Sequence, residues 1–192
     1  GHATLATAYC LKKHMNFNKD FVKFDSMSGE LMVKFDGDYM QMDFPHRKPI
    51  KSDLPQNIMD SLSIKPREIL KSRDYVLVYE NEDQIKDIQI NKELFDKKNI
   101  DPGGVVITSV GSKSDFVSRY FIPQCSFFED PVTGSTHCSL VPYWSEKLNK
   151  KKLKSIQLSE RGGEMTCEDV VNRVLINGKA VTYSEGHVHL KY

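Results

Sequence analysis

Two segments place glycine and hydroxyl residues directly before an apolar, helix-forming run. The first is Gly-His-Ala-Thr at residues 1–4, and the second is Glu-Asp-Pro-Val-Thr-Gly-Ser-Thr-His-Cys at residues 129–138. A helix N-terminus offers free backbone N–H groups and the positive end of the helix dipole, and both attract an anion. A glycine there lets a ligand approach the backbone closely. If the two helix starts face each other across a cleft, they would hold a small carboxylate between them.

An ionisable side chain accompanies each of these segments. His2 follows the first glycine, and Asp130 precedes the second helix start. An aspartate beside a carboxylate site can exchange protons with the ligand, and a histidine can polarise it or relay a proton near neutral pH. Thr4 or Ser135 could instead cap a structural helix, which is the simpler interpretation of either segment alone. Their joint occurrence, with Asp130 and His2 beside them, favours a site.

Thiol chemistry fits the sequence less well. A two-thiol racemase would need one reactive cysteine at each helix start, but Cys10 and Cys138 are expected inside the two helices, where buried cysteines are usually inert. His137 and Cys138 are adjacent, so on a helix they point about 100° apart and do not form a nucleophilic pair. We therefore expect no thiol mechanism.

A metal site is the next alternative. His187 and His189 would lie on one face of a predicted strand, at a spacing that a pair of ligands could use. No third ligand is evident, so we expect both to be solvated. The sequence thus predicts no metal and no other cofactor.

The charge balance and cysteine usage limit the partners. The chain has 27 basic and 26 acidic residues and a net charge of +1, which gives no basic surface for nucleic acid or an anionic membrane. No segment approaches the ~20 apolar residues of a membrane span. The four scattered cysteines contain no C-x-x-C pair. This usage predicts a reducing, cytoplasmic location.

The first half of the chain predicts a helix followed by a meander. The helix starts directly after residue 2 and is nearly apolar all round to residue 11, which indicates a buried helix. Alternating apolar residues at 21–24, 31–35 and 39–44, separated by glycine-containing turns, predict three antiparallel strands. The prolines from residue 45 onward then indicate a boundary. We expect residues 1–46 to be the remainder of an N-terminal lobe and residues 47–192 to form a C-terminal lobe. The last strand can return to the first lobe.

The second half alternates between helices and strands. The run at 136–148 predicts a second main helix, and Asn177-Gly178 is a type I′ hairpin signal between two strands. Together these patterns predict an α+β fold of two similar lobes, each a mostly antiparallel sheet around a central helix. The expected short helices are 57–62 and 91–98, and the expected strands are 75–79, 105–110, 116–122, 156–158, 164–167, 173–176, 180–183 and 187–190.

The two glycine-containing segments also carry a family resemblance. Residues 1–6 and 129–138 resemble the two signature motifs of the phenazine biosynthesis protein F (PhzF-like) isomerases, and residues 142–146 continue the second motif into its helix. Residues 119–123 and 161–164 match the family pattern as well. The resemblance implies the diaminopimelate-epimerase-like fold, in which the active site lies between two similar lobes.

The resemblance also implies a chemistry, namely cofactor-independent proton movement on a small substrate that bears a carboxylate. The phenazine enzyme of the family isomerises a dihydro-hydroxyanthranilate, with a glutamate that shuttles the proton. Carried over onto this chain, the catalytic residues would be His2, Asp130 and Ser135. The substrate-binding residues would be Gly1, Thr4, Gly134 and Ser135, with the amides of Gly1, Gly134 and Ser135 holding the carboxylate.

One part of the family pattern is absent from this sequence. The general-base glutamate of the family lies ahead of the Gly-His-Ala-Thr motif, so we expect these 192 residues to be the C-terminal part of a longer polypeptide and to be inactive alone. The alternative is a non-catalytic protein that binds a small acid or a partner on the same scaffold. Edge strands of a β-rich lobe would also allow a homodimer.

Overall fold

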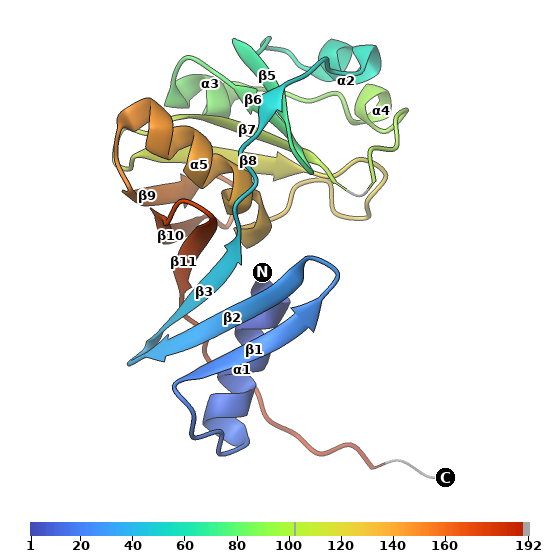
Figure 1. The fold of residues 1–192 in the computed structure, drawn as a ribbon. Helices are drawn as coiled ribbons and strands as arrows, with labels where there is room; N and C mark the ends of the chain where they lie inside the picture. Colours follow the sequence, from blue (N-terminus) through green and yellow to red (C-terminus); the bar gives the residue numbers. More distant parts are fainter. Residues whose placement is uncertain (102, 190–192) are drawn as a thin grey trace.

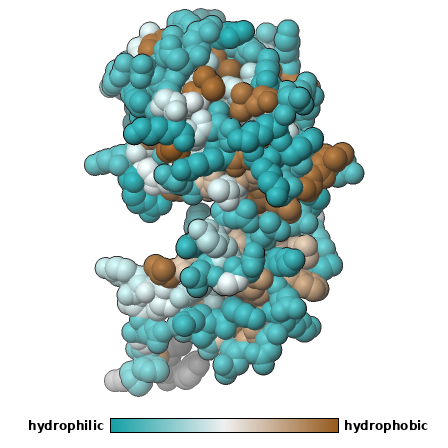
Figure 2. Space-filling model, turned by 90° about the vertical axis from the view of Figure 1, so that its left-hand side faces the viewer, coloured by the Kyte–Doolittle hydropathy of each residue, from teal (hydrophilic) through white to brown (hydrophobic). Residues whose placement is uncertain are grey.

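The computed structural model describes residues 1–101 and 103–189, which form an α+β fold. The helices and strands make two lobes, one below the other in Figure 1, and a single sheet of eleven strands runs through both. Figure 2 shows a notch at the left between the two lobes. The α+β class and the two-lobe plan predicted from the sequence are confirmed.

The lower lobe holds the first helix and the predicted meander. Gly29 and Gly37 occupy its two turns at φ +86° and +56°, a backbone conformation that a side chain disfavours. The elements of this lobe are α1 (His2–His14), β1 (Phe21–Ser26), β2 (Gly29–Asp36) and β3 (Tyr39–Pro45).

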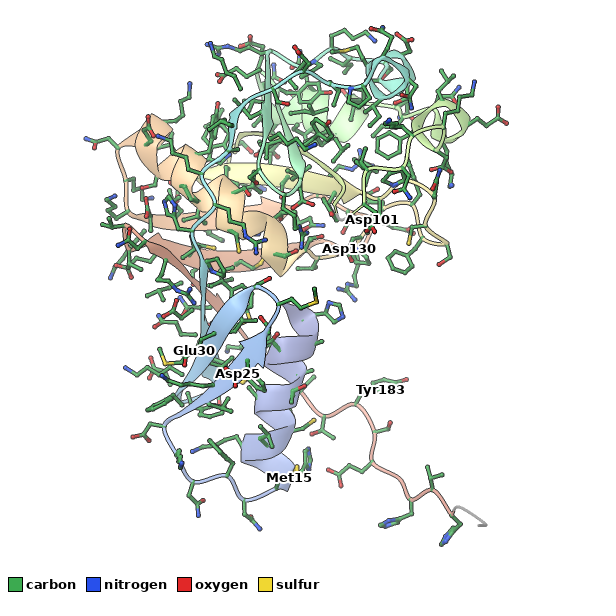
Figure 3. All side chains as sticks on the ribbon, turned by 45° about the vertical axis from the view of Figure 1, so that its right-hand side comes forward. Met15, Asp25, Glu30, Asp101, Asp130 and Tyr183 are labelled. Atoms are coloured by element: carbon green, nitrogen blue, oxygen red, sulfur yellow. The ribbon has the colours of Figure 1, made fainter. Side chains whose placement is uncertain are left out.

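The helix α1 is less buried than its composition predicted. Ala8 is its one buried residue, and Cys10 is exposed. The sheet covers one side of the helix, as Figure 3 shows, while the alanines and threonines of the other side lie at the surface. The prediction of a buried helix, including a buried Cys10, is therefore wrong for the described residues. Alanine and threonine suit an exposed helix face as well as a buried one, so their lack of charge did not report burial.

The upper lobe contains the remaining elements. Its main helix lies against one face of the sheet (Figure 1), and every residue from His137 to Ser145 is buried. The predicted helix at 91–98 is confirmed but shorter. The elements are β4 (Ile50–Lys51), α2 (Gln56–Ser61), β5 (Glu68–Lys71), β6 (Tyr75–Val78), α3 (Glu82–Asp87), α4 (Lys92–Phe95), β7 (Val105–Val110), β8 (Phe116–Phe121), the 3₁₀ turn η1 (Gly134–Thr136), α5 (His137–Leu148), β9 (Lys152–Gln157), β10 (Gly163–Asp169) and β11 (Arg173–Gly178).

The strand order explains how the lobes are joined. It runs β1-β2-β3-β11-β10-β9-β8-β7-β6-β5-β4, so the last strand of the chain pairs with β3 of the lower lobe. In that pairing Val174 lies opposite Phe44 and Ile176 lies opposite Met42. All pairs of neighbours are antiparallel except β6–β7 and β8–β9. The division predicted between residues 46 and 47 stays a prediction.

The end of the chain differs from the expectation. Residues 179–189 contain no strand, so the strand predicted at 180–183 and the hairpin at Asn177-Gly178 are wrong. Both edges of β11 are already occupied, by β10 and by β3, and no partner position is left for a hairpin. The segment lies along α1 instead, where the Thr182 hydroxyl is 2.8 Å from Nε2 of His14. The strand predicted at 187–190 ends outside the described residues, and 187–189 are not part of a strand.

Candidate active site

The two helix starts singled out in the sequence meet between the lobes. Gly1 precedes the first turn of α1, and Gly134 opens the 3₁₀ turn that leads into α5. A Cβ atom added to Gly1 would lie 3.4 Å from Cα of Gly134 and 3.6 Å from the amide nitrogen of Ser135. The backbones of the two helix starts therefore lie close together.

A cavity of about 730 Å³ adjoins this meeting point, and we call it the interlobe cavity. Of the six residues predicted for the site, Gly1, His2, Asp130 and Gly134 line it, whereas Thr4 and Ser135 do not. Figure 3 shows Asp130 at the lower edge of the upper lobe, above the start of α1. The apolar part of the lining consists of Leu5, Met42, Phe127, Pro131, Val132 and Met165, and its charged part includes Arg161, Glu164 and Lys179.

The amides at the start of η1 face no acceptor of their own. Within the described residues, no hydrogen bond from the amide of Gly134 or Ser135 is present, and the first bond of the turn comes from the amide of His137 to the oxygen of Gly134. No side chain in the described part of the chain caps this helix start. Free N–H groups at a helix start suit an anion, so the geometry agrees with a carboxylate held here.

Ser135 presents its hydroxyl away from the interlobe cavity, toward a cation. Its Oγ accepts a hydrogen bond of 3.3 Å from Nη2 of Arg73. The Arg73 guanidinium also donates to both carboxylate oxygens of Asp74, over 3.1 and 3.2 Å. Asp74 is 2% exposed and further accepts from the Tyr120 hydroxyl at 2.8 Å. The simpler interpretation, in which Ser135 caps the helix, is not what the structure shows.

Asp130 is held by the residues that follow it. Its Oδ2 accepts a hydrogen bond of 2.6 Å from the Thr133 hydroxyl, and its carbonyl accepts one of 2.6 Å from Nε2 of Gln157. The neighbouring Glu129 also lines the cavity, but Arg119 binds both of its oxygens at 2.8 Å. Asp130 is therefore the better placed of the two carboxylates for proton exchange with a ligand.

The buried histidine of the second motif has a structural environment. His137 is fully buried, its Nδ1 lies 3.1 Å from the Thr133 carbonyl, and its Nε2 lies 2.8 Å from the Ser155 hydroxyl. Burial lowers the pKa of His137 to about 4, so the ring is neutral at pH 7. Burial likewise raises the pKa of the Cys138 thiol. Neither side chain is suited to nucleophilic catalysis at neutral pH.

No cluster of three or more histidine, cysteine, aspartate or glutamate side chains able to hold a metal is present in residues 1–101 and 103–189. His187 and His189 are exposed and lie outside any strand. In the same residues, no helix is both long and apolar enough to cross a membrane.

Sequence reasoning did not identify three residues at this site, namely Arg73, Asp74 and Gln157. They lie in an ordinary polar turn and at a strand end, and carry no motif. Arg73 is 62 residues from Ser135, and Gln157 is 24 residues from Thr133, so only the tertiary fold reveals either pairing.

The family profile, the related sequences and the solved structures that match this chain all belong to one protein family. The sequence profile of the phenazine biosynthesis-like protein family (PhzC-PhzF) matches residues 1–186. An uncharacterized isomerase of Pseudomonas aeruginosa is 39% identical over 190 residues, which cover 99% of this chain and 73% of the relative.

Solved structures of the family share this fold. A PhzF-family protein of Enterococcus faecalis superposes with a TM-score of 0.88 at 37% identity, and a putative PhzC/PhzF protein of Clostridium difficile with 0.87 at 40%. Each comparison covers 99% of this chain and 73% of the other. The diaminopimelate-epimerase-like arrangement expected from the resemblance is thereby supported.

Proposed function

The chain belongs to the phenazine biosynthesis-like protein family. We propose that it is part of an isomerase that moves a proton on a small, carboxylate-bearing substrate without a cofactor. The observation that carries the proposal is the near contact of Gly1 with Gly134 beside a cavity lined by Asp130 and His2.

The proposal assigns the binding of the substrate to the backbone. The amides of Gly134 and Ser135 would donate to the substrate carboxylate, and the positive end of the α5 dipole would add to the attraction. Leu5, Met42 and Met165 line the same cavity and suit the carbon skeleton of a cyclic acid. Binding through amides would select a carboxylate by its shape and charge, and would leave the ionisable side chains for the chemistry.

The proposal assigns proton movement to Asp130 and His2. Asp130 can accept or return a proton at an oxygen that faces the ligand, and the exposed ring of His2 can relay a proton. Ser135 acts through its amide, because its hydroxyl accepts from Arg73 outside the cavity lining. The general-base glutamate that the family resemblance assigns to the segment ahead of Gly1 stays a prediction.

A second function, non-catalytic binding of a small acid, is favoured by one feature of the site. The two amide donors belong to the helix start and do not depend on Asp130 or His2. The scaffold would therefore keep its affinity for a carboxylate even where proton transfer is lost.

The test is the incorporation of solvent deuterium into a dihydro-hydroxyanthranilate by the full-length protein, followed by mass spectrometry. We expect Asp130→Asn and His2→Asn each to slow exchange by at least about 100-fold, the scale of general acid–base catalysis, and to leave the protein folded. His14→Asn, at the other end of α1, and Asp25→Asn, on the exposed side of β1, are the matched controls.

Wild-type exchange in either Asp130→Asn or His2→Asn would refute the assignment of the catalytic residues. If the wild-type protein binds anthranilate but exchanges no proton, the binding function is supported instead.

A further inference from the structure

We propose that Thr133 and Gln157 are positioning residues for Asp130, and that together they fix which of its carboxylate oxygens faces the interlobe cavity. The proposal rests on the role of Asp130 given above. It adds a chain of hydrogen bonds from the buried Gln157 amide, through the Thr133 hydroxyl, to the partly buried Asp130 carboxylate.

The orientation of the Gln157 amide follows from its partners. Gln157 ends β9 and is 1% exposed. One end of its amide lies 2.7 Å from the backbone nitrogen of Thr133, which can only donate, so that end is the oxygen Oε1. The other end lies 2.6 Å from the carbonyl of Asp130, which can only accept, so that end is Nε2. Both contacts demand the same orientation.

The orientation of the amide sets the direction of the next bond. Nε2 of Gln157 also donates to Oγ1 of Thr133, over 3.2 Å. A hydroxyl has one hydrogen, and the hydrogen of Thr133 is then directed to Oδ2 of Asp130, 2.6 Å away. Oδ2 is thereby committed as an acceptor. Oδ1 has no hydrogen bond within the described residues, and it is the oxygen left for a ligand in the cavity.

No other side chain of the described residues holds the Asp130 carboxylate, which forms no ion pair there. The backbone between β8 and η1 forms no regular element beyond one isolated bridge at Glu129, and the Asp130 amide donates to the Tyr120 carbonyl at 3.0 Å. These backbone contacts hold the main chain of Asp130 and leave its carboxylate to the Thr133 hydroxyl. Gln157 ties this loop to the sheet at two points, Asp130 and Thr133. Loss of the hydroxyl would therefore release the carboxylate to rotate, and a misplacement of about 1 Å costs on the order of 100-fold in rate.

The first arm of the test is structural and needs no substrate. Crystal structures of full-length Thr133→Val and Thr133→Ser are compared with the wild type. Valine has the shape of threonine without the hydroxyl, so we expect the Asp130 carboxylate to leave its position in Thr133→Val and to keep it in Thr133→Ser. If Thr133→Val does not fold, the smaller Thr133→Ala replaces it. An unchanged Asp130 carboxylate in the variant without a hydroxyl would overturn the proposal.

The second arm is kinetic and uses the deuterium exchange assay on dihydro-hydroxyanthranilate. We expect Thr133→Val to lower kcat by roughly 10- to 100-fold with KM changed less than about threefold, and Thr133→Ser to restore the rate. Ser61→Ala, which removes a buried hydroxyl in α2 outside the cavity lining, is the control and should leave kcat unchanged. A Thr133→Val enzyme with wild-type kcat contradicts the proposal.

Asp130→Asn, measured in parallel, separates this proposal from the one on which it rests. If Asp130→Asn still exchanges, the proposed function fails. If Asp130→Asn is inactive while Thr133→Val keeps both the rate and the carboxylate position, only the positioning role fails. If the wild-type protein does not exchange this probe, the structural comparison decides.

Discussion

At the residue scale, the site draws its donors for an anion from the backbone and leaves its ionisable side chains for proton transfer. Gly1 and Gly134 allow the two helix starts to approach within contact distance, and the amides of Gly134 and Ser135 have no acceptor among residues 1–101 and 103–189. A nearby cation, Arg73, is held by the buried Asp74 and reaches the Ser135 hydroxyl. Each group thus has a separate role that a single substitution can test.

Replacing Ser135 by proline removes one amide donor at a place where a helix tolerates proline. A hydrogen bond to a charged group contributes about 1.5–3 kcal/mol, so we expect anthranilate to bind roughly 10- to 100-fold more weakly. Isothermal titration of the full-length protein measures the change. Ser135→Ala keeps the amide and loses only the bond to Arg73, and it should bind nearly as the wild type does. Equal affinity of Ser135→Pro and the wild type would argue against the amide site.

The buried Asp74 makes a prediction about stability. Tyr120→Phe removes the hydroxyl that donates to Asp74, and it leaves a buried carboxylate with one donor fewer. We expect a loss of about 1–3 kcal/mol in the free energy of unfolding, measured with urea. Tyr183→Phe is the control because Tyr183 is fully exposed, and it should be neutral. A neutral Tyr120→Phe would show that Asp74 does not need this donor.

At the element scale, α5 is the part of the fold that positions the site, and it is also the part best predicted from sequence. An apolar run and the motif before it indicated the helix α5. The meander of β1–β3 was predicted as well, from its alternating apolar residues. The strand β5 and the helix α3 were not predicted, because Glu68–Lys71 and Glu82–Asp87 are short and carry charges at both ends.

The errors at the chain ends share a physical cause. Residues 180–183 alternate as a strand does, but pairing requires a free edge, and β11 has none. The surface of α1 was misjudged because the sequence alone does not say how many sides of a helix are covered. At the site, the two motifs predicted the cavity-lining residues Gly1, His2, Asp130 and Gly134. Arg73 and Gln157 were not predicted, because each contacts the site through a residue far away in the sequence.

The start of α5 is tied to β9 by His137, which predicts a pH dependence of stability. Its pKa is about 4 in the folded state and about 6.5 when unfolded, so the unfolded chain binds a proton first as the pH falls. The contribution of His137 to the free energy of unfolding is therefore complete above pH 6.5. It declines as the pH falls toward 4 and does not change further below that. The total loss is about 3 kcal/mol.

Urea unfolding at pH 7.5 and 4.5 measures this loss. Relative to His137→Gln, which cannot take up a proton, the wild type should lose about 2–3 kcal/mol more between the two pH values. Parallel losses in the two proteins would contradict the assignment of a neutral, buried His137.

At the scale of the whole molecule, the sheet and one apolar core hold the two helix starts close to each other. The pairing of β11 with β3 carries the sheet from one lobe to the other. One apolar cluster contains Ala8 of α1, Met42 of β3, Ile176 of β11 and Leu140 of α5, and so it spans both lobes. The β11–β3 hydrogen bonds and this shared apolar cluster therefore fix the two lobes beside the interlobe cavity.

The most direct test of the account is a crystal structure of the full-length protein with anthranilate, a stable aromatic carboxylate. We predict the ligand in the interlobe cavity, with its carboxylate within hydrogen-bond distance of the amides of Gly134 and Ser135 and its ring against Leu5 and Met42. A carboxylate bound elsewhere, for example beside Lys12 and Lys13 in another pocket against α1, would contradict the proposed site.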